Sequence, residues 1–250
     1  ARLLAGPVGQ PLEADRAFTE ALERLPPDAA LAAEHSRLRR EQAPLRRLPW
    51  AEPLEAFARR SSDRRAAAAA WRDAAYLSLA QEDAGTALRC ARRAYARTRE
   101  EPAFVGPLLA RVLYRMGGGG EALVLHRALL ESGFQGIDVG DAAVLCRQLA
   151  ELAEDAGEAD LAFSALDRLL DLRPQELEAA EWRFRLDPDR GRAVRTLAEA
   201  AGAARSARSR SGALGIAAGA ALEELGDGTL AQELWQRARS EAAGYPGQLA

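Results

Sequence analysis

The sequence predicts an all-α fold: a right-handed α-α superhelix of stacked helical hairpins. Composition is the first reason. Of the 250 residues, 57 are Ala, 37 are Leu and 34 are Arg, and all three are strong helix formers. Val and Ile together number only nine, which leaves little material for a β-sheet. The second reason is a helix-turn-helix pattern that recurs along the chain.

The residues that are missing exclude several functions. The chain has no Lys, so it cannot carry a Walker-A phosphate loop, a pyridoxal Schiff base or a catalytic lysine. It has no Asn and therefore no N-glycosylation site. Two cysteines do not make a disulfide framework, and no apolar stretch is long enough to span a membrane. The net charge of −3 does not favour a chain that binds nucleic acid over its whole surface.

The clearest hairpin is predicted between Trp71 and Tyr95. Small and apolar residues of segment 71–78 recur at i, i+3, i+4 and i+7, which places them on one face of a helix. A polar turn follows at 81–83. Residues 84–94 then carry a second apolar stripe, made largely of Ala. Small side chains let two facing helices approach closely, so the segment predicts a tight helical hairpin.

The same arrangement recurs at a regular spacing. A glycine is followed five residues later by an alanine and then by a bulky residue, and the best copies are Gly9–Pro26, Gly157–Pro174 and Gly226–Ala238. The alanines at the equivalent position are Ala14, Ala87, Ala122, Ala162 and Ala231. They are separated by 73, 35, 40 and 69 residues, which fits a period of 34 to 35 residues with two double steps and one short insertion.

A period near 34 residues, with this order of Gly, Ala, bulky residue, Ala and closing Pro, resembles the second helix of tetratricopeptide repeats. The resemblance covers most of the chain and implies one solenoid over residues 1–250 with six to seven repeats. The first repeat lacks most of its leading helix, prolines make two copies degenerate, and 131–141 is expected to be an insertion loop. A looser solenoid of α-hairpins is the alternative. The repeats are expected near 1–30, 31–65 (degenerate), 68–101, 103–133, 141–175, 176–208 (degenerate) and 211–243.

Residues that could form a phosphate-binding, metal or catalytic site are better explained as parts of turns, packed cores or solvated surfaces. Gly117–Gly120 has neither the preceding strand nor the following Lys of a phosphate loop, so we expect a turn between paired helices. Two histidines are too few for a metal site; His126 occupies a bulky packing position, whereas His35 lies among arginines and is expected to be solvated. Cys90 and Cys146 fall within helices and are interpreted as packing residues. We therefore expect no enzyme activity, no metal and no cofactor.

The sign of the charge alternates along the chain. Residues 37–65 hold nine Arg and four acidic residues, residues 151–181 hold ten acidic residues and two Arg, and residues 190–210 are again basic. Such alternation is typical of a solvated helical surface, and it also suits a surface that selects a charged partner. A nucleic-acid-binding helical repeat that uses the Arg clusters 37–65 and 190–210 is the alternative function. An aromatic content of 6% argues against it, because single strands bind on aromatic stacking platforms.

The resemblance also implies a binding groove. In tetratricopeptide repeats the concave surface is lined by polar-face positions of each first helix. Arg and Tyr are common at binding hot spots, and Arg can hold a carboxylate with two hydrogen bonds. We therefore predict that the groove between Arg72 and Arg147 prefers an acidic segment or a C-terminal carboxylate. Family members that clamp the C-termini of heat-shock chaperones use Lys and Asn, which this chain lacks. The groove positions carried onto this chain are Arg72, Tyr76, Arg111, Tyr114, Arg115, Arg147, Glu151 and Arg185.

Together these features predict a non-catalytic scaffold or adaptor that binds a protein or peptide partner in its concave groove. Rigid stacked hairpins present a preformed groove, so little conformational entropy is lost on binding. The truncated first repeat and the Arg-rich, Ala-rich composition suggest a region of a larger bacterial assembly, or of a secretion or envelope protein. The sequence leaves open whether the chain is cytoplasmic or periplasmic.

Overall fold

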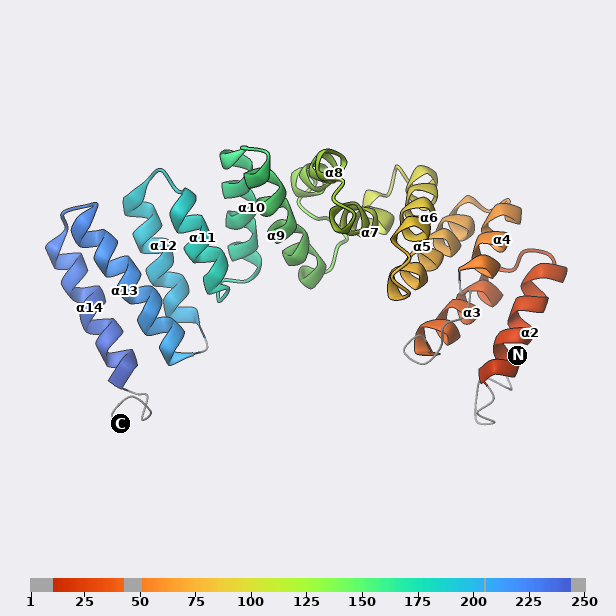
Figure 1. Cartoon of the computed structure of the whole chain (residues 1–250), viewed down its shortest axis with the longest axis horizontal. Coiled ribbons are helices and arrows are strands. Elements are labelled where there is room, and N and C mark those ends of the chain that lie inside the picture. The colour runs from red at the N-terminus through yellow and green to blue at the C-terminus, as the bar shows by residue number, and fades with distance from the viewer. Residues whose placement is uncertain (1–10, 43–50, 205, 244–250) are drawn as a thin grey trace. The chain divides into compact units, whose positions relative to one another are not determined.

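A computed structural model of the chain describes residues 11–42, 51–204 and 206–243. Within these residues the regular secondary structure consists of thirteen α-helices and no strand, which confirms the all-α prediction (Figure 1). The helices fall into two compact units, Ala1–Ile137 and Asp138–Ala250. Gly9, the start of the first predicted repeat copy, lies outside the described residues.

In the first unit each described helix packs against the next one along the chain, and alternate helices also touch. Helix α3 contacts α5, and α5 contacts α7, so these helices form one layer; α2 and α4 contact each other in the second layer. This is the arrangement of stacked hairpins. The helices are α2 (Pro11–Arg24), α3 (Ala29–Gln42), α4 (Glu52–Arg60), α5 (Arg64–Ala80), α6 (Ala84–Arg97), α7 (Pro102–Arg115) and α8 (Gly119–Glu131).

The second unit repeats this arrangement. Its pairs α9 with α10 and α13 with α14 make the most extensive helix contacts, and α11 touches α13 across the layer of first helices. Residues 132–138, within the predicted insertion loop, precede its first helix. The helices are α9 (Val139–Asp155), α10 (Ala159–Leu172), α11 (Leu177–Leu186), α12 (Arg190–Ala203), α13 (Ala207–Glu223) and α14 (Gly228–Ala243).

Local residues explain where the helices begin and end. The Asp63 carboxylate caps α5 by accepting the backbone N–H groups of Arg65 and Ala66 at 2.9 and 3.1 Å, and such a cap contributes about 1 kcal/mol. Gly117 and Gly157 end the first helices of their hairpins with φ values of +69° and +74°, a left-handed conformation that glycine adopts without strain. The prediction that Gly117–Gly120 forms the turn between paired helices is confirmed for Gly117 and Gly118, whereas Gly119 and Gly120 are the first residues of α8.

The core is built from the residues that define the repeat. The five repeat alanines are all buried, and each lies where a second helix approaches its neighbours. Trp71 is the largest fully buried side chain among the described residues. His126 lies in the core as expected, and its Nδ1–H donates to the Ala122 carbonyl at 2.7 Å. Cys90 and Cys146 are also buried among the packed helices.

The expectation that His35 is solvated is wrong. Its side chain is fully buried between α2 and α3, where its ring stacks on Phe18 at 5.5 Å. Asp15 explains the burial, because this carboxylate accepts hydrogen bonds from His35 Nε2 at 2.8 Å and from Arg39 Nε at 2.6 Å. The arginines near His35 in the sequence favour a solvated helix face, but one of them, Arg39, belongs to a buried polar cluster with His35 and Asp15.

Candidate partner-binding surface

Five of the predicted groove residues lie on two first helices of the first unit. Arg72 and Tyr76 are on α5, and Arg111, Tyr114 and Arg115 are on α7, the helix that packs beside it. Tyr76 and Arg115 are exposed, whereas the other three are half-buried. The structure thus places these five side chains on neighbouring helices of one layer.

Arg72 forms one wall of a cleft of about 590 Å³. Its guanidinium lies over the ring of Phe104, 4.3 Å from the centroid, and pairs with Asp73 at 3.2 Å. The second oxygen of Asp73 accepts a hydrogen bond from Ser36 Oγ at 2.7 Å, so the carboxylate is anchored from α3 as well. The stacking and the ion pair hold the Arg72 head in one place, with a quarter of the side chain open to solvent. The cleft is lined by Arg72, Glu101, Pro102, Ala103, Phe104, Ser132, Gln135 and Gly136.

Positive side chains outnumber negative ones on helices α5 and α7. Helices α5 and α7 carry five arginines and a single carboxylate, that of Asp73. Besides Arg72, which pairs with Asp73, Arg64 donates to the Arg97 carbonyl at 2.6 Å, and Arg65 pairs with Glu101 at 3.3 Å.

The remaining predicted groove residues, Arg147, Glu151 and Arg185, lie in the second unit. Arg147 and Glu151 are on α9 and half-buried, and Arg185 is exposed on α11. Arg147 forms ion pairs with Glu176 at 2.5 Å and Glu178 at 3.1 Å. Burial disfavours its charged form, but hydrogen bonds to the two glutamates outweigh burial and raise the pKa of Arg147. Its charge is therefore already offset within the chain.

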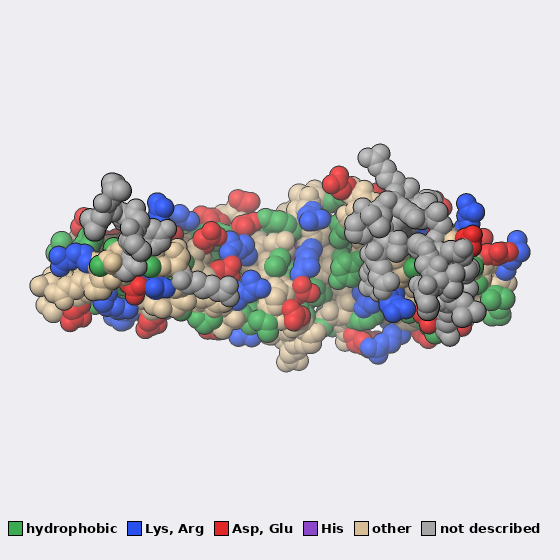
Figure 2. All heavy atoms as spheres, turned by 90° about the horizontal axis from the view of Figure 1, so that it is seen from below, with side chains coloured by type: hydrophobic (Ala, Val, Ile, Leu, Met, Phe, Trp, Pro, Cys, Tyr) green, Lys and Arg blue, Asp and Glu red, His purple; other side chains and the backbone are tan. Residues whose placement is uncertain are grey.

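Much of the basic stretch 190–210 is also paired internally. Arg190 pairs with Glu224, Arg192 with Asp187 at 2.8 Å, and Arg210 with Glu241 at 2.8 Å. On the face drawn in Figure 2, basic and acidic side chains are interspersed and do not gather into a field of one sign. Arginines that are already paired with carboxylates release few counterions when they meet a phosphate backbone.

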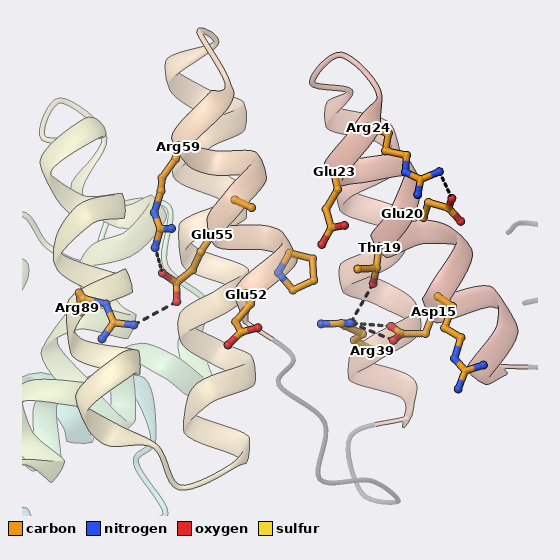
Figure 3. A pocket seen from close by; sticks show the side chains of 13 residues that line it. Asp15, Thr19, Glu20, Glu23, Arg24, Arg39, Glu52, Glu55, Arg59 and Arg89 are labelled. Carbon is orange, nitrogen blue, oxygen red and sulfur yellow. Dashed lines mark hydrogen bonds and ion pairs between the residues drawn. The ribbon is translucent and has the colours of Figure 1, made fainter.

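A second cleft, of about 930 Å³, was not predicted from the sequence (Figure 3). It lies between α2 and α4, and carboxylates and guanidinium groups alternate along its walls. Glu55 on α4 is buried there and pairs with Arg59 at 2.7 Å and Arg89 at 3.2 Å. Glu55 and Arg59 lie on α4, but Arg89 comes from α6, 34 residues further along the chain, so local spacing in the sequence could not have revealed the whole cluster.

Metal ligands and cysteine thiols are the remaining groups to consider among the described residues. Among them there is no group of three or more His, Cys, Asp or Glu side chains that could hold a metal ion. Burial raises the pKa of both Cys90 and Cys146 to about 12, so neither thiol forms a reactive thiolate near neutral pH. None of the described helices is both long and apolar enough to cross a membrane.

Comparison with known structures agrees with this architecture. The chain has a tetratricopeptide-like fold. It is similar to the C-terminal part of a TPR repeat-containing protein from Cytophaga hutchinsonii, with a TM-score of 0.59 and 13% identity over 98% of this chain and 95% of that one. It is also similar to MamA from Desulfovibrio magneticus RS-1 (TM-score 0.51, 15% identity, 70% of this chain and 94% of that one).

A third similar structure is YrrB, described as a TPR protein with an unusual peptide-binding site (TM-score 0.51, 16% identity, 71% of this chain and 88% of that one). The sequence itself matches no protein-family model and no curated protein. At these identities the likeness concerns the fold and not the partner.

Proposed function

We propose that the chain is a non-catalytic scaffold of a bacterial assembly, which binds an acidic segment of a partner protein on helices α5 and α7. One observation carries the proposal: helices α5 and α7 carry five arginines against one carboxylate, and they border the cleft, lined also by Glu101, in which Arg72 lies over Phe104. A cleft with an aromatic floor and a fixed guanidinium suits a side chain that ends in a carboxylate.

The groove residues of the first unit take different roles in this proposal. Arg72, Arg111 and Arg115 supply the positive charge, and Tyr76 and Tyr114 supply flat contact area at a low cost in side-chain entropy. The intramolecular contacts of Arg72 fix its position beforehand, so less freedom is lost when a partner binds.

In the second unit, Arg147, Glu151 and Arg185 form the corresponding proposed contact surface. Arg147 can bind a partner carboxylate only if the side chain of Glu178, which is largely exposed, moves away and its ion pair with Arg147 breaks. We therefore expect Arg147 to contribute less to the affinity for an acidic partner than Arg72 does. That YrrB is described as having a peptide-binding site supports a peptide as the class of partner.

The test uses a fluorescein-labelled poly-Glu peptide with a free C-terminus, and fluorescence anisotropy as the measurement. Arg72→Glu is expected to lower the affinity about tenfold or more, because a tenfold loss corresponds to only about 1.4 kcal/mol. Arg147→Glu is expected to have a smaller effect.

Arg99→Glu is the matched control, because Arg99 is exposed in the turn between α6 and α7 and undergoes the same change of charge. A poly-Arg peptide of equal length checks the sign of the preference. Equal affinities of the Arg72→Glu and Arg99→Glu variants, or preferred binding of poly-Arg, would contradict the proposal.

A further inference from the structure

Trp235 stands out when equivalent positions of the hairpins are compared. In each copy the residue four places after the repeat alanine lies on the second helix. Phe18, Ala91 and Leu166 occupy this position in α2, α6 and α10 and are at most 1% exposed, because the following first helix covers them. Trp235 occupies it in α14, the last described helix, and is 47% exposed. A large aromatic side chain thus occupies a position that is covered in the other copies.

Trp235 belongs to a continuous face that α13 and α14 share. Its ring lies over Gly215 of α13: a Cβ atom added at Gly215 would be 3.8 Å from Cζ3 of Trp235. Ile216, next to Gly215, is 48% exposed. Helical spacing brings further residues of α13 onto the same stripe. We call this surface the end face; it consists of Arg208, Gly212, Gly215, Ile216, Gly219, Glu223 and Trp235.

The end face is complementary to itself. The end-face positions of α13 are evenly spaced about the point between Gly215 and Ile216: Gly212 and Gly219 lie at equal distances from it, and so do Arg208 and Glu223. If two copies of α13 lie antiparallel, Ile216 of one copy meets Gly215 of the other, and Gly212 meets Gly219. No atom lies within 4 Å of a Cβ added at Gly212 or Gly219, so this surface is open to an approaching helix.

The charges follow the same symmetry. Antiparallel packing places Arg208 of one copy beside Glu223 of the other, twice in the pair. Both side chains are exposed, and neither forms an ion pair within the part of the chain that the structure describes. Arg210, by contrast, is paired with Glu241 across the hairpin and is not needed for this contact.

We propose that two copies of the chain associate through the end face, around a two-fold axis that lies in the plane of the face and runs perpendicular to α13. A contact of this kind is closed, because each copy uses the same residues. The proposal concerns a surface separate from the groove on α5 and α7 and does not depend on the partner proposed for that groove.

The size of the face sets the expected strength. Helix α13 has 17 residues, which corresponds to a length of about 25 Å, and two adjacent helices present a width of roughly 20 Å. The face therefore buries on the order of 500 Å² per copy, which is characteristic of weak, concentration-dependent association. We expect a monomer at low micromolar concentration and a growing dimer fraction towards hundreds of micromolar.

Sedimentation velocity of the 250-residue chain over this concentration range tests the proposal. Gly219→Gln is the decisive variant, because the new side chain has room in the monomer and glutamine favours a helix over glycine. It should abolish the dimer while leaving the melting temperature unchanged or higher. Gly120→Gln in α8 is the matched control; this glycine also has open space around it, and the variant should dimerise like the parent chain.

Charge exchange supplies an independent test. Arg208→Glu and Glu223→Arg should each weaken the dimer several-fold, and the double variant should restore it, because the pair then forms with its signs reversed. A chain that stays monomeric at every concentration would overturn the proposal and leave a different protein as the occupant of the end face. A Gly219→Gln variant that dimerises like the parent, or a double variant that fails to recover, would overturn it as well.

Discussion

Asp15 is predicted to stabilise the first unit by about 2 kcal/mol at neutral pH. Burial raises its pKa, but hydrogen bonds from His35 and Arg39 outweigh burial and lower the pKa from 3.8 to about 2. A difference of nearly two pH units corresponds to about 2 kcal/mol, at 1.36 kcal/mol per unit. Because the pKa of the folded state lies below that of the unfolded state, this contribution is fully present above pH 3.8 and is lost as the pH falls towards 2.

Asp15→Asn tests this reasoning, because the amide keeps the size of the side chain and removes the charge. Hydrogen–deuterium exchange of peptides from α2 and α3 measures the local free energy of opening. We expect the variant to lose about 2 kcal/mol at pH 7, and urea unfolding should show the difference from the parent chain shrinking between pH 4 and pH 2. Glu20→Gln, on the same helix, removes an exposed ion pair with Arg24 and should cost less than about 0.5 kcal/mol. An Asp15→Asn variant as stable as the Glu20→Gln control at pH 7 would refute the assignment.

Two further predictions follow from the turns and the thiols. Glu82 has a φ of +62° and occupies the left-handed turn position that Gly157 takes in its own hairpin. Because glycine adopts this conformation without strain, Glu82→Gly should raise the free energy of unfolding by about 0.5–1 kcal/mol, and Gly157→Ala should lower it by about 1 kcal/mol. Urea unfolding of each variant measures both effects. Because burial raises the pKa of Cys90 and Cys146 to about 12, both thiols should stay unmodified by an aromatic disulfide reagent at pH 8 until denaturant is added; rapid modification of the native chain would show that they are accessible.

Periodicity predicted the fold because the determinants of this fold are local. The stripe that begins at Trp71 and the alanine at position 87 define two helix faces and the close contact between them, all within one hairpin. Gly157 and Gly117 mark turns by their backbone conformation alone. A solenoid consists of such hairpins packed on their neighbours, so local patterns carry most of the architecture.

Periodicity could not predict how the charges are partnered. Asp15 and Arg39 are 24 residues apart on different helices, and only the packing of α2 on α3 brings them together. Arg147 is similar, because Glu176, which pairs with it, lies 29 residues away at the start of the next hairpin. How many carboxylates an arginine already contacts therefore depends on contacts between helices: Arg147 pairs with two glutamates of the next hairpin, whereas Arg72 pairs with its sequence neighbour Asp73, and only the structure shows this difference.

Arginine is the only strongly basic residue in this chain, and the geometry of its guanidinium group gives a structural reason for its use. Arg183 lies over the ring of Phe163 at 4.4 Å and at the same time pairs with Asp187 at 3.1 Å. Arg72 combines stacking on Phe104 with its ion pair to Asp73 in the same way. A planar guanidinium can stack through its face while its edge donates hydrogen bonds, whereas an ammonium group cannot do both in a fixed geometry. In a chain whose helices touch mainly through alanine, such stacked arginines provide contacts that are at once apolar and directional. The same property makes Arg72 suited to hold a carboxylate without losing its position in the fold.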